Sequence, residues 1–314
     1  MDKKFMAILL IVVVAAVIVF TYFNFIQERD GAITIGALPG DYNPALVVAN
    51  KTRTFDAQGL NTKVVLYNDD RELITAVANG TVDVAYMDIS HVLSYVEKGA
   101  PIKIISAAQN GGSGLIVSNK TSINSASDLV GKNVAMPSEN SIQYLLLEKY
   151  LKDNGISIKD VNLSSESCSY MNESIKKGKI DAAITYEPYV DINMNNGSKL
   201  LLNSDALMPD HPNIVMIASD DFISKHPNET KHIVKIHEST TNSINNNSSK
   251  LMGMVPLNGV LDPVLKQQFV SNVSLISGLS DEYIQNVNNF MNIEIDLGYL
   301  KQPIPQEKLF WLDN

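Results

Sequence analysis

LITAVANGTVDVAY, residues 73–86, is the stretch that decides the fold of this chain of 314 residues. Its apolar positions recur at helical spacing as far as Ala78, a glycine turn follows, and Val82 begins a short run typical of a strand. A glycine just past the last turn of a helix takes the left-handed conformation that ends the helix. The stretch therefore predicts a helix, a turn and a strand in succession.

A second stretch, KGKIDAAITYEPY at residues 177–189, has the same helix end, glycine turn and strand start. The two stretches belong to longer segments that align at one constant offset. Such an offset, kept from a first strand to a third, indicates one βαβαβ unit built twice, and hence two similar lobes. Turn chemistry explains the glycines and aspartates of the motif. The aligned pairs are Pro39 with Pro137, Gly80 with Gly178, and Asp83 with Asp181.

Short apolar runs and helical periods alternate through both units, which is typical of an α/β fold. Capping residues mark the expected starts of three helices: Asn43, Asp69, and either Asn140 or Ser141. Strands are expected at residues 33–38, 63–67 and 82–86 of the first unit, and at 133–136, 161–163 and 180–184 of the second.

Two apolar stretches beside the second unit, residues 115–119 and 213–219, are the expected crossovers between the lobes. A chain that leaves one lobe, builds the other and returns must cross the boundary twice. We therefore expect the first lobe to comprise residues 31–114 and 219–314, and the second residues 115–218.

The remainder of the chain is expected to be helical and to pack on the first lobe, with a tail at residues 298–312 that reaches across as a strap. The expected helices lie at residues 226–247, 262–271 and 280–291.

Residues 5–26 carry no charge, and at about 1.5 Å per residue a helix of this length crosses a hydrocarbon core. Lys3 and Lys4 precede the run, and this positive charge keeps the N-terminus in the cytoplasm. We expect residues 1–30 to be a cytoplasmic stub and a single-pass anchor that holds the binding domain outside the cytoplasm, at the cell membrane. A cleaved signal peptide is the alternative, although the run exceeds a typical signal and no cleavage pattern follows it.

Charge and cysteine content exclude several classes of function. The chain has 25 Lys and Arg against 34 Asp and Glu, a net charge of −9. Nucleic-acid binding needs a basic surface, so we expect no nucleic-acid partner. One cysteine, Cys168, cannot form an internal disulfide or the commonest structural zinc cluster. We expect no metal, no cofactor and no catalytic residues.

In open α/β sheets, ligands bind beyond the carboxyl ends of the strands, so the residues there are the candidate site. These loops are rich in hydroxyls, amides and tyrosines, and contain no Lys or Arg. Two lobes that present such edges to each other form a cleft for a small polar molecule. Helix capping, turns and half-buried packing are the alternative roles for the same side chains. The predicted ligand-binding residues are Asp41, Tyr42, Met87, Asp88, Ser90, Ser113, Ser138, Asn140, Ser141, Tyr186 and Glu187.

Several segments of the chain resemble ABC-transporter solute-binding proteins for nitrate, sulfonates and taurine, which have the type II periplasmic-binding-protein fold. The resemblance covers residues 32–312 and implies two lobes, each a mixed sheet flanked by helices. It also implies a monomer that captures a small solute outside the cell and delivers it to a membrane permease driven by a cytoplasmic ATPase. The segments are GALPGDYNPALVVA at 36–49, FDAQGL at 55–60, SASDLVGKNVAMP at 125–137, and the two repeated stretches.

The resemblance also implies roles for individual residues. In taurine-type relatives, the acid of an aromatic-acid-Pro element suits a ligand amine, and Glu187 matches that acid. Tyr186 stands where relatives often have Trp, and Asp88 adds an acid where a small or neutral residue is commoner. These departures leave the identity of the ligand open.

Charge narrows the choice of ligand. Helix N-termini at Asn43, Asn140 and Ser141 offer free N–H groups that hold an oxyanion without Lys or Arg. Acids at the same rim repel a bare anion, whereas an amine-bearing zwitterion satisfies both sets of groups. Taurine-like ligands are therefore favoured, other sulfonates come next, and nitrate or a pyrimidine precursor is less favoured.

Two other functions are compatible with the sequence. An anchored domain of this fold can sense a ligand and signal to a membrane partner rather than to a transporter. An enzyme related to thiamine-pyrimidine synthesis is the less favoured alternative, with Cys168 as nucleophile and His91 as base.

Overall fold

The computed structural model describes residues 31–38, 43–139, 141–256 and 262–312. The chain divides into two units, Met1–Ala32 and Ile33–Asn314, and the features below belong to the second. Within the described ranges, no helix combines the length and apolar character needed to cross a membrane. The predicted anchor at residues 5–26 lies outside those ranges and stays a prediction. The predicted site residues Asp41, Tyr42 and Asn140 also lie outside them.

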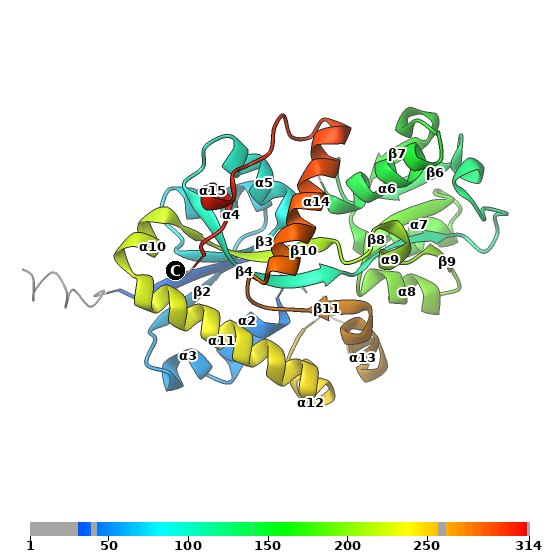
Figure 1. Ribbon diagram of the computed structural model, residues 1–314. Helices are drawn as coiled ribbons and strands as arrows, with labels where there is room; N and C mark the ends of the chain where they lie inside the picture. Colours follow the sequence, from blue (N-terminus) through cyan, green and yellow to red (C-terminus); the bar gives the residue numbers. More distant parts are fainter. Residues whose placement is uncertain (1–30, 39–42, 140, 257–261, 313–314) are drawn as a thin grey trace, which may run out of the picture. The chain divides into compact units, whose positions relative to one another are not determined.

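The larger of two sheets has six strands in the order β11-β4-β10-β3-β1-β2 (Figure 1). β1 runs parallel to β2 and β3, whereas β10 and β11 run antiparallel to their neighbours. The strands are β1 (Ile33–Ala37), β2 (Thr62–Leu66), β3 (Val84–Asp88), β4 (Ile102–Gly111), β10 (Pro212–Ser219) and β11 (Val273–Leu275).

The smaller sheet has five strands in the order β7-β6-β8-β5-β9. β6 runs parallel to β7 and β8, whereas β5 runs antiparallel to β8 and β9. The strands are β5 (Ser113–Val117), β6 (Asn133–Met136), β7 (Asn162–Ser165), β8 (Ala182–Tyr186) and β9 (Lys199–Leu202). Two mixed sheets flanked by helices confirm this part of the predicted fold class.

The predicted duplication is visible in the order of the strands, because β2-β1-β3-β10 and β7-β6-β8-β5 have the same directions. The motif aspartates have the same structural role in each sheet. Asp83 accepts a hydrogen bond from the Thr34 backbone N–H at 2.7 Å, and Asp181 accepts one from that of Asn133 at 3.0 Å. Each carboxylate thus ties the start of one parallel strand to its neighbour, which confirms a structural role for the motif.

Helices of the two repeated units connect the strands. Asp69 caps α4, as predicted, by accepting hydrogen bonds from the backbone N–H groups of Arg71 and Glu72. The helices are α2 (Pro44–Lys51), α3 (Thr54–Ala57), α4 (Asp70–Ala78) and α5 (Ile89–Glu97) in the first unit, and α6 (Ile142–Asp153), α7 (Cys168–Lys176), α8 (Tyr189–Asn195) and α9 (Ser204–Leu207) in the second.

The sheets divide the chain at different residues from those predicted. β5 pairs with β8 from Ser113 onward, and β10 pairs with β3 and β4 of the larger sheet. The crossings therefore lie near Gly112 and between β9 and β10, rather than at 114/115 and 218/219. An apolar strand is buried in either sheet, so composition alone could not assign β10. Whether the sheets belong to two lobes that move separately stays a prediction.

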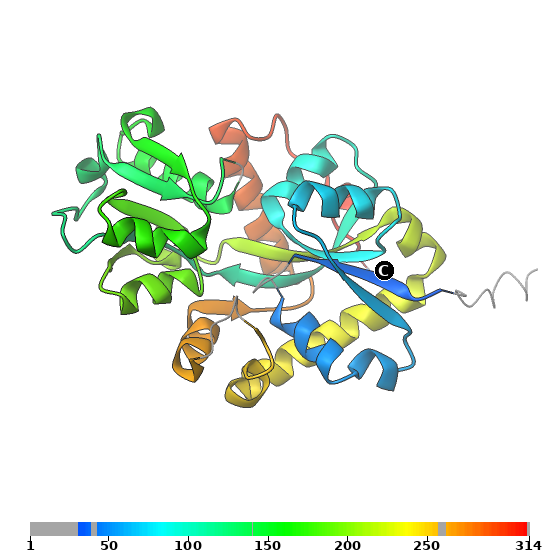
Figure 2. The ribbon, with the colours of Figure 1, turned by 180° about the vertical axis from the view of Figure 1, so that it is seen from behind.

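The C-terminal third adds α10 (Asp220–Lys225), α11 (Pro227–Asn246), α12 (Ser248–Met252), α13 (Pro263–Asn272), α14 (Asp281–Leu297) and α15 (Gln306–Leu309). α13 and α14 do not pack on the larger sheet alone, because α13 also contacts α8 and α14 also contacts α6 (Figure 2). Lys152 on α6 donates to the carbonyl of Asp296 on α14 at 2.9 Å. These two helices therefore join the elements of the two sheets.

The C-terminal tail stays with the larger sheet. Phe310 forms an isolated bridge with Ile104 on β4, and the Trp311 N–H donates to the Ile104 carbonyl at 2.9 Å. Only its first residues reach the other side, where the Tyr299 hydroxyl donates to Glu148 of α6. The predicted strap is thus limited to the segment around Tyr299.

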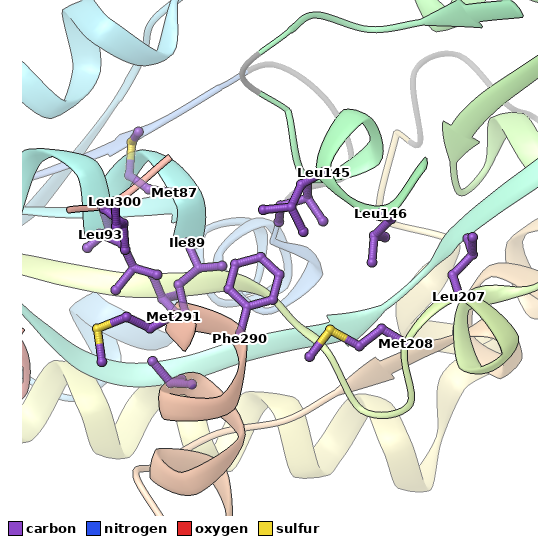
Figure 3. Packing of buried hydrophobic residues seen from close by; sticks show 14 of the residues in the cluster. Met87, Ile89, Leu93, Leu145, Leu146, Leu207, Met208, Phe290, Met291 and Leu300 are labelled. Atoms are coloured by element: carbon purple, nitrogen blue, oxygen red, sulfur yellow. The ribbon is translucent and has the colours of Figure 1, made fainter. Parts of the chain in front are cut away.

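One apolar cluster continues from the helices of the larger sheet to those of the smaller one (Figure 3). Phe290 on α14 is fully buried in it, together with Ile89 on α5 and Leu145 on α6. Burying a phenylalanine contributes about 1.5–3 kcal/mol to folding. The same packing places the ends of β3 and β8 on either side of a small polar cavity.

Candidate functional site

A cavity of about 20 Å³ lies where β3 and β8 end, and we call it the inner cavity. Its volume accommodates about one water molecule. Residues of both sheets and of α6 line it. None of its described lining residues is Lys, Arg or His. Those residues are Asp88, Gln109, Gln143, Tyr186, Glu187, Asn213 and Ile214.

Glu187 is the most deeply buried acid of the inner cavity, with 5% of its surface exposed. Its Oε1 accepts a hydrogen bond from the Asn272 side-chain amide at 2.8 Å, and its Oε2 accepts one from the Asp191 N–H at 3.2 Å. Burial, followed by repulsion from the Asp191 carboxylate, raises the pKa of Glu187 from 4.5 to about 7. Near neutral pH this carboxyl group is therefore half protonated, and an added cation would favour its charged form.

Asp88 ends β3 and caps α5, where its Oδ1 accepts a hydrogen bond from the Ser90 N–H at 2.7 Å. The same oxygen lies 3.7 Å from His91 Nδ1. Burial by itself would lower the pKa of His91, but Asp88, and then Asp70 and Asp69, outweigh this effect and raise the pKa to about 9. His91 is therefore a cation at neutral pH, and Asp88 already has a positively charged partner.

Two of the amide side chains of the inner cavity are positioned by hydrogen bonds to neighbouring residues. Gln143, at the start of α6, donates from Nε2 to the Ser113 hydroxyl at 3.2 Å. Asn213 on β10 donates to the Gly111 carbonyl at 2.7 Å. Oε1 of Gln109 is buried and has no hydrogen-bond partner among the described residues. The cavity thus combines two carboxyl groups with amides that can accept or donate.

A larger space of about 240 Å³ lies between α5, α6 and the C-terminal end of α14, and we call it the outer groove. Ser141 caps α6 here by accepting from the Tyr144 N–H at 3.2 Å. Glu294 is 2% exposed, and burial raises its pKa to about 8. Unlike the inner cavity, the outer groove has cationic side chains. Its lining residues are Arg71, Ser90, His91, Ser94, Tyr95, Lys98, Glu139, Ser141, Leu145, Glu294 and Tyr299.

The predicted site residues are therefore distributed over several environments. Asp88, Tyr186 and Glu187 meet at the inner cavity, and Ser90 and Ser141 line the outer groove. Ser113 lines neither space but positions Gln143. These placements do not test ligand binding, so the assignments stay predictions.

Met87 and Ser138 are not placed as predicted. Met87 is fully buried in the apolar cluster with Leu93 and Leu300, because side chains alternate along β3 and Met87 points to the opposite face from Asp88 (Figure 3). Ser138 is exposed and lines neither space; its carbonyl accepts a hydrogen bond from the Ser141 hydroxyl at 2.8 Å. Both residues are better explained by packing and turn formation.

Three amide residues of the inner cavity are not among the predicted ligand-binding residues. Gln109 and Asn213 lie on β4 and β10, where strand position gives no hint of a polar role. Gln143 follows the cap of α6, a position that indicates only helix. A buried polar residue in an otherwise apolar strand was the one available signal, and it applies to Gln109 and Asn213.

Cys168 is unsuited to act as a nucleophile. It is 4% exposed in an apolar cluster of the smaller sheet, and burial raises its pKa to about 11. His91, the base of the alternative enzyme hypothesis, lines the outer groove instead. The thiol is therefore protonated at neutral pH and lacks the proposed base.

Comparison with known proteins agrees with this geometry. A family model described as NMT1/THI5 like matches residues 43–249. The taurine-binding periplasmic protein of Escherichia coli (strain K12) is 26% identical over 171 residues, which are 54% of this chain and 53% of that protein. The chain thus spans about half the length of this curated relative in the match.

Solved structures of the same fold include two sulfonate-binding proteins. The alkanesulfonate-binding protein SsuA from Xanthomonas axonopodis pv. citri, bound to MOPS, superimposes with a TM-score of 0.75 at 16% identity, covering 91% of this chain and 99% of that one. The periplasmic aliphatic sulphonate binding protein SsuA from Escherichia coli gives 0.76 at 13% identity, covering 90% and 92%. At this identity the likeness concerns the fold alone.

The three relatives described above are named as binding proteins, the class that the sequence predicts for this chain. The predicted resemblance to type II periplasmic binding proteins of the nitrate, sulfonate and taurine group is likewise confirmed. Because the family model matches more than half of the chain, the chain belongs to the NMT1/THI5-like family.

Proposed function

We propose that this chain is the solute-binding protein of an ABC importer and that it captures a small amine-bearing sulfonate of the taurine type. The observation that carries the proposal is the inner cavity, where Asp88 and Glu187 meet amide side chains without a described Lys, Arg or His. The name of the taurine-binding relative supports the same class of ligand.

The amine of the ligand is assigned to Glu187. Asp88 already pairs with His91, whereas Glu187 has only hydrogen-bond donors and a second carboxylate near it. An ammonium group would offset the burial that raises the pKa of Glu187, so binding favours the ionised acid. Amine binding should therefore strengthen as the pH rises through about 7.

The sulfonate is assigned to the side of the outer groove. The N-terminus of α6, which begins at Ile142 after the neutral cap Ser141, lies there and offers backbone N–H groups to an anion. The same groove is lined by three cationic side chains and two acids: Arg71, His91 and Lys98, and Glu139 and Glu294. A zwitterion with its amine at the inner cavity and its anion toward the groove therefore meets opposite charge at both ends.

A solute of this size does not fit a cavity of about 20 Å³ as it stands. We therefore include hinge movement in the proposal: the free chain opens at the crossings near Gly112 and between β9 and β10 to admit the solute, and then closes around it. Small-angle scattering of the chain with and without taurine tests it. A smaller radius of gyration with taurine supports hinge closure, and an unchanged radius of gyration contradicts it.

Delivery to a permease and its ATPase, action as a monomer, and anchoring at the cell membrane through residues 5–26 belong to the same proposal. Co-purification of the full chain with the permease would test delivery. Fractionation of cells between membrane and soluble pools would test anchoring, because an anchored chain stays with the membrane after a salt wash.

The decisive experiment is a thermal-shift screen of residues 31–314 against taurine, other sulfonates, nitrate, amino acids and pyrimidines. A ligand at a hundred times its Kd stabilises the folded state by about 2.7 kcal/mol, a readily measured shift. Taurine or another aminosulfonate should give the largest shift. No shift with any sulfonate, or the largest shift with nitrate, would overturn the proposal.

A further inference from the structure

Asn272 reaches from the elements of the larger sheet to the acids of the smaller one. It is the last residue of α13, and Val273, which follows it, pairs with Gly111 on β4. Its side-chain Nδ2 lies 2.8 Å from Glu187 Oε1, and 3.2 Å from each oxygen of the Asp191 carboxylate. The amide group of Asn272 thus contacts two carboxyl groups, those of Glu187 and Asp191, which are four residues apart at the start of α8.

The two acids also line a second space behind the inner cavity. This rear cavity, of about 390 Å³, is lined by Glu187, Asp191 and Asn272 among others. Glu187 lines both spaces, so its side chain forms part of the wall between them. Asn272 therefore holds Glu187 from the rear side, opposite the space assigned to the ligand.

The charge of the residue at position 272 matters because the surroundings are acidic. Asp88 faces Glu187 in the inner cavity, and Asp191 and Asp205 face it from the rear cavity. No described residue lining either space is Lys, Arg or His. An amide supplies two N–H donors without a positive charge. It thus separates the two carboxylates while leaving their negative charge available to a cation in the inner cavity.

We propose that Asn272 is a positioning residue that holds the Glu187 carboxylate as the acceptor for a ligand ammonium, and thereby sets a preference for amine-bearing over amine-free sulfonates. This inference rests on the proposed function for the identity of the ligand. Its structural part, the hydrogen bond by which Asn272 positions Glu187, does not depend on any ligand. The two parts therefore need separate measurements.

The first measurement uses the ligand-free chain. Carbon NMR of labelled glutamate carboxyl groups follows the titration of Glu187. The Glu187 signal is the one that disappears from the spectrum of Glu187→Gln. The hydrogen bond from Asn272 lowers the pKa of Glu187 against burial and Asp191, so Asn272→Ala should raise the midpoint by about one unit, the scale of a charged hydrogen bond. An unchanged midpoint would overturn the proposal.

The second measurement is calorimetric titration between pH 6 and 8.5 with taurine and with 2-hydroxyethanesulfonate, in which a hydroxyl replaces the amine. Near pH 7, Asn272→Ala should bind taurine about fivefold more weakly, because a pKa higher by one unit lowers the ionised fraction of Glu187 from about one half to about one eleventh. The loss should shrink toward pH 8.5, and affinity for the hydroxyl analogue should stay the same. An equal loss for both compounds at every pH indicates a purely structural role and would overturn the proposal.

Asn245→Ala is the matched control. The Asn245 side chain donates to the Leu275 carbonyl at 3.0 Å, on the strand that follows Asn272, and it forms no hydrogen bond to an acid among the described residues. This variant should keep both the Glu187 midpoint and the affinity ratio. Asn272→Ser, which retains one donor, should restore part of the taurine affinity. If the wild type binds neither compound but the midpoint still shifts in Asn272→Ala, the proposed function fails and the hold on Glu187 stands.

Discussion

Replacing Glu187 by glutamine should stabilise the ligand-free protein at alkaline pH while weakening amine binding. The pKa of Glu187 is about 7 in the folded state against an ordinary value of 4.5. A carboxyl group with a raised pKa in the folded state favours folding below its unfolded pKa, and this advantage is lost as the pH rises through the folded value. The cost of the buried charge is thus absent at pH 4.5 and complete above pH 7.

The difference of about 2.5 units corresponds to about 3 kcal/mol at most. Glutamine avoids this cost, but its NH₂ group cannot accept the hydrogen bond that the Asp191 N–H gives to Oε2, which removes about 1 kcal/mol. Glu187→Gln should therefore be about 2 kcal/mol more stable than the wild type at pH 8. At pH 4.5 it should be equal or slightly less stable.

Urea unfolding of both proteins at pH 4.5, 6, 7 and 8 measures this difference. Glu173→Gln is the control, because Glu173 is exposed on α7 and only forms an i,i+4 pair with Lys177. Such a surface pair contributes about 0.5 kcal/mol or less, so its effect should be small. A stability difference between Glu187→Gln and the wild type that stays constant over this pH range would refute the reasoning.

Three further predictions concern other parts of the fold. Asp88→Asn should keep the cap of α5 but remove the charge that raises the pKa of His91, so proton NMR should show His91 titrating well below its wild-type value of about 9; an unchanged midpoint contradicts this. Cys168 should react with a thiol reagent about 100-fold more slowly in the native than in the unfolded protein, because its pKa is about 11 instead of 9; equal rates would disprove the burial effect. Phe290→Ala should lower the free energy of unfolding by about 3–5 kcal/mol, whereas Val264→Ala, at a site that is 64% exposed, should change it by less than about 0.5 kcal/mol in urea titrations; similar values for both would contradict the packing.

The duplicated fold was predictable because its signals are local. Helix ends, capping residues and glycine turns depend on neighbours within a few residues. The expected strand at residues 133–136 matches β6 (Asn133–Met136), and Asp69 caps α4 as predicted. β11 (Val273–Leu275) was missed because it has three residues and is a strand only through its pairing with β4.

The candidate site was predictable only where the chain itself ends a strand. Asp88, Tyr186 and Glu187, which line the inner cavity, were predicted for this reason. Met87 was included among the predicted ligand-binding residues because the sequence did not reveal which face of β3 turns to the core. Asn272 and Gln143 reach the inner and rear cavities through the packing of α13 and α6, which leaves no pattern in the local sequence.

The sequence by itself therefore determined the two repeated units and the acids at their strand ends, since backbone preferences and periodicity act over short distances. Tertiary structure alone decided that Glu187 is buried and that Asn272, 85 residues further along the chain, donates a hydrogen bond to it. Burial and the proximity of charges set the protonation of this acid, and both are properties of the packed molecule.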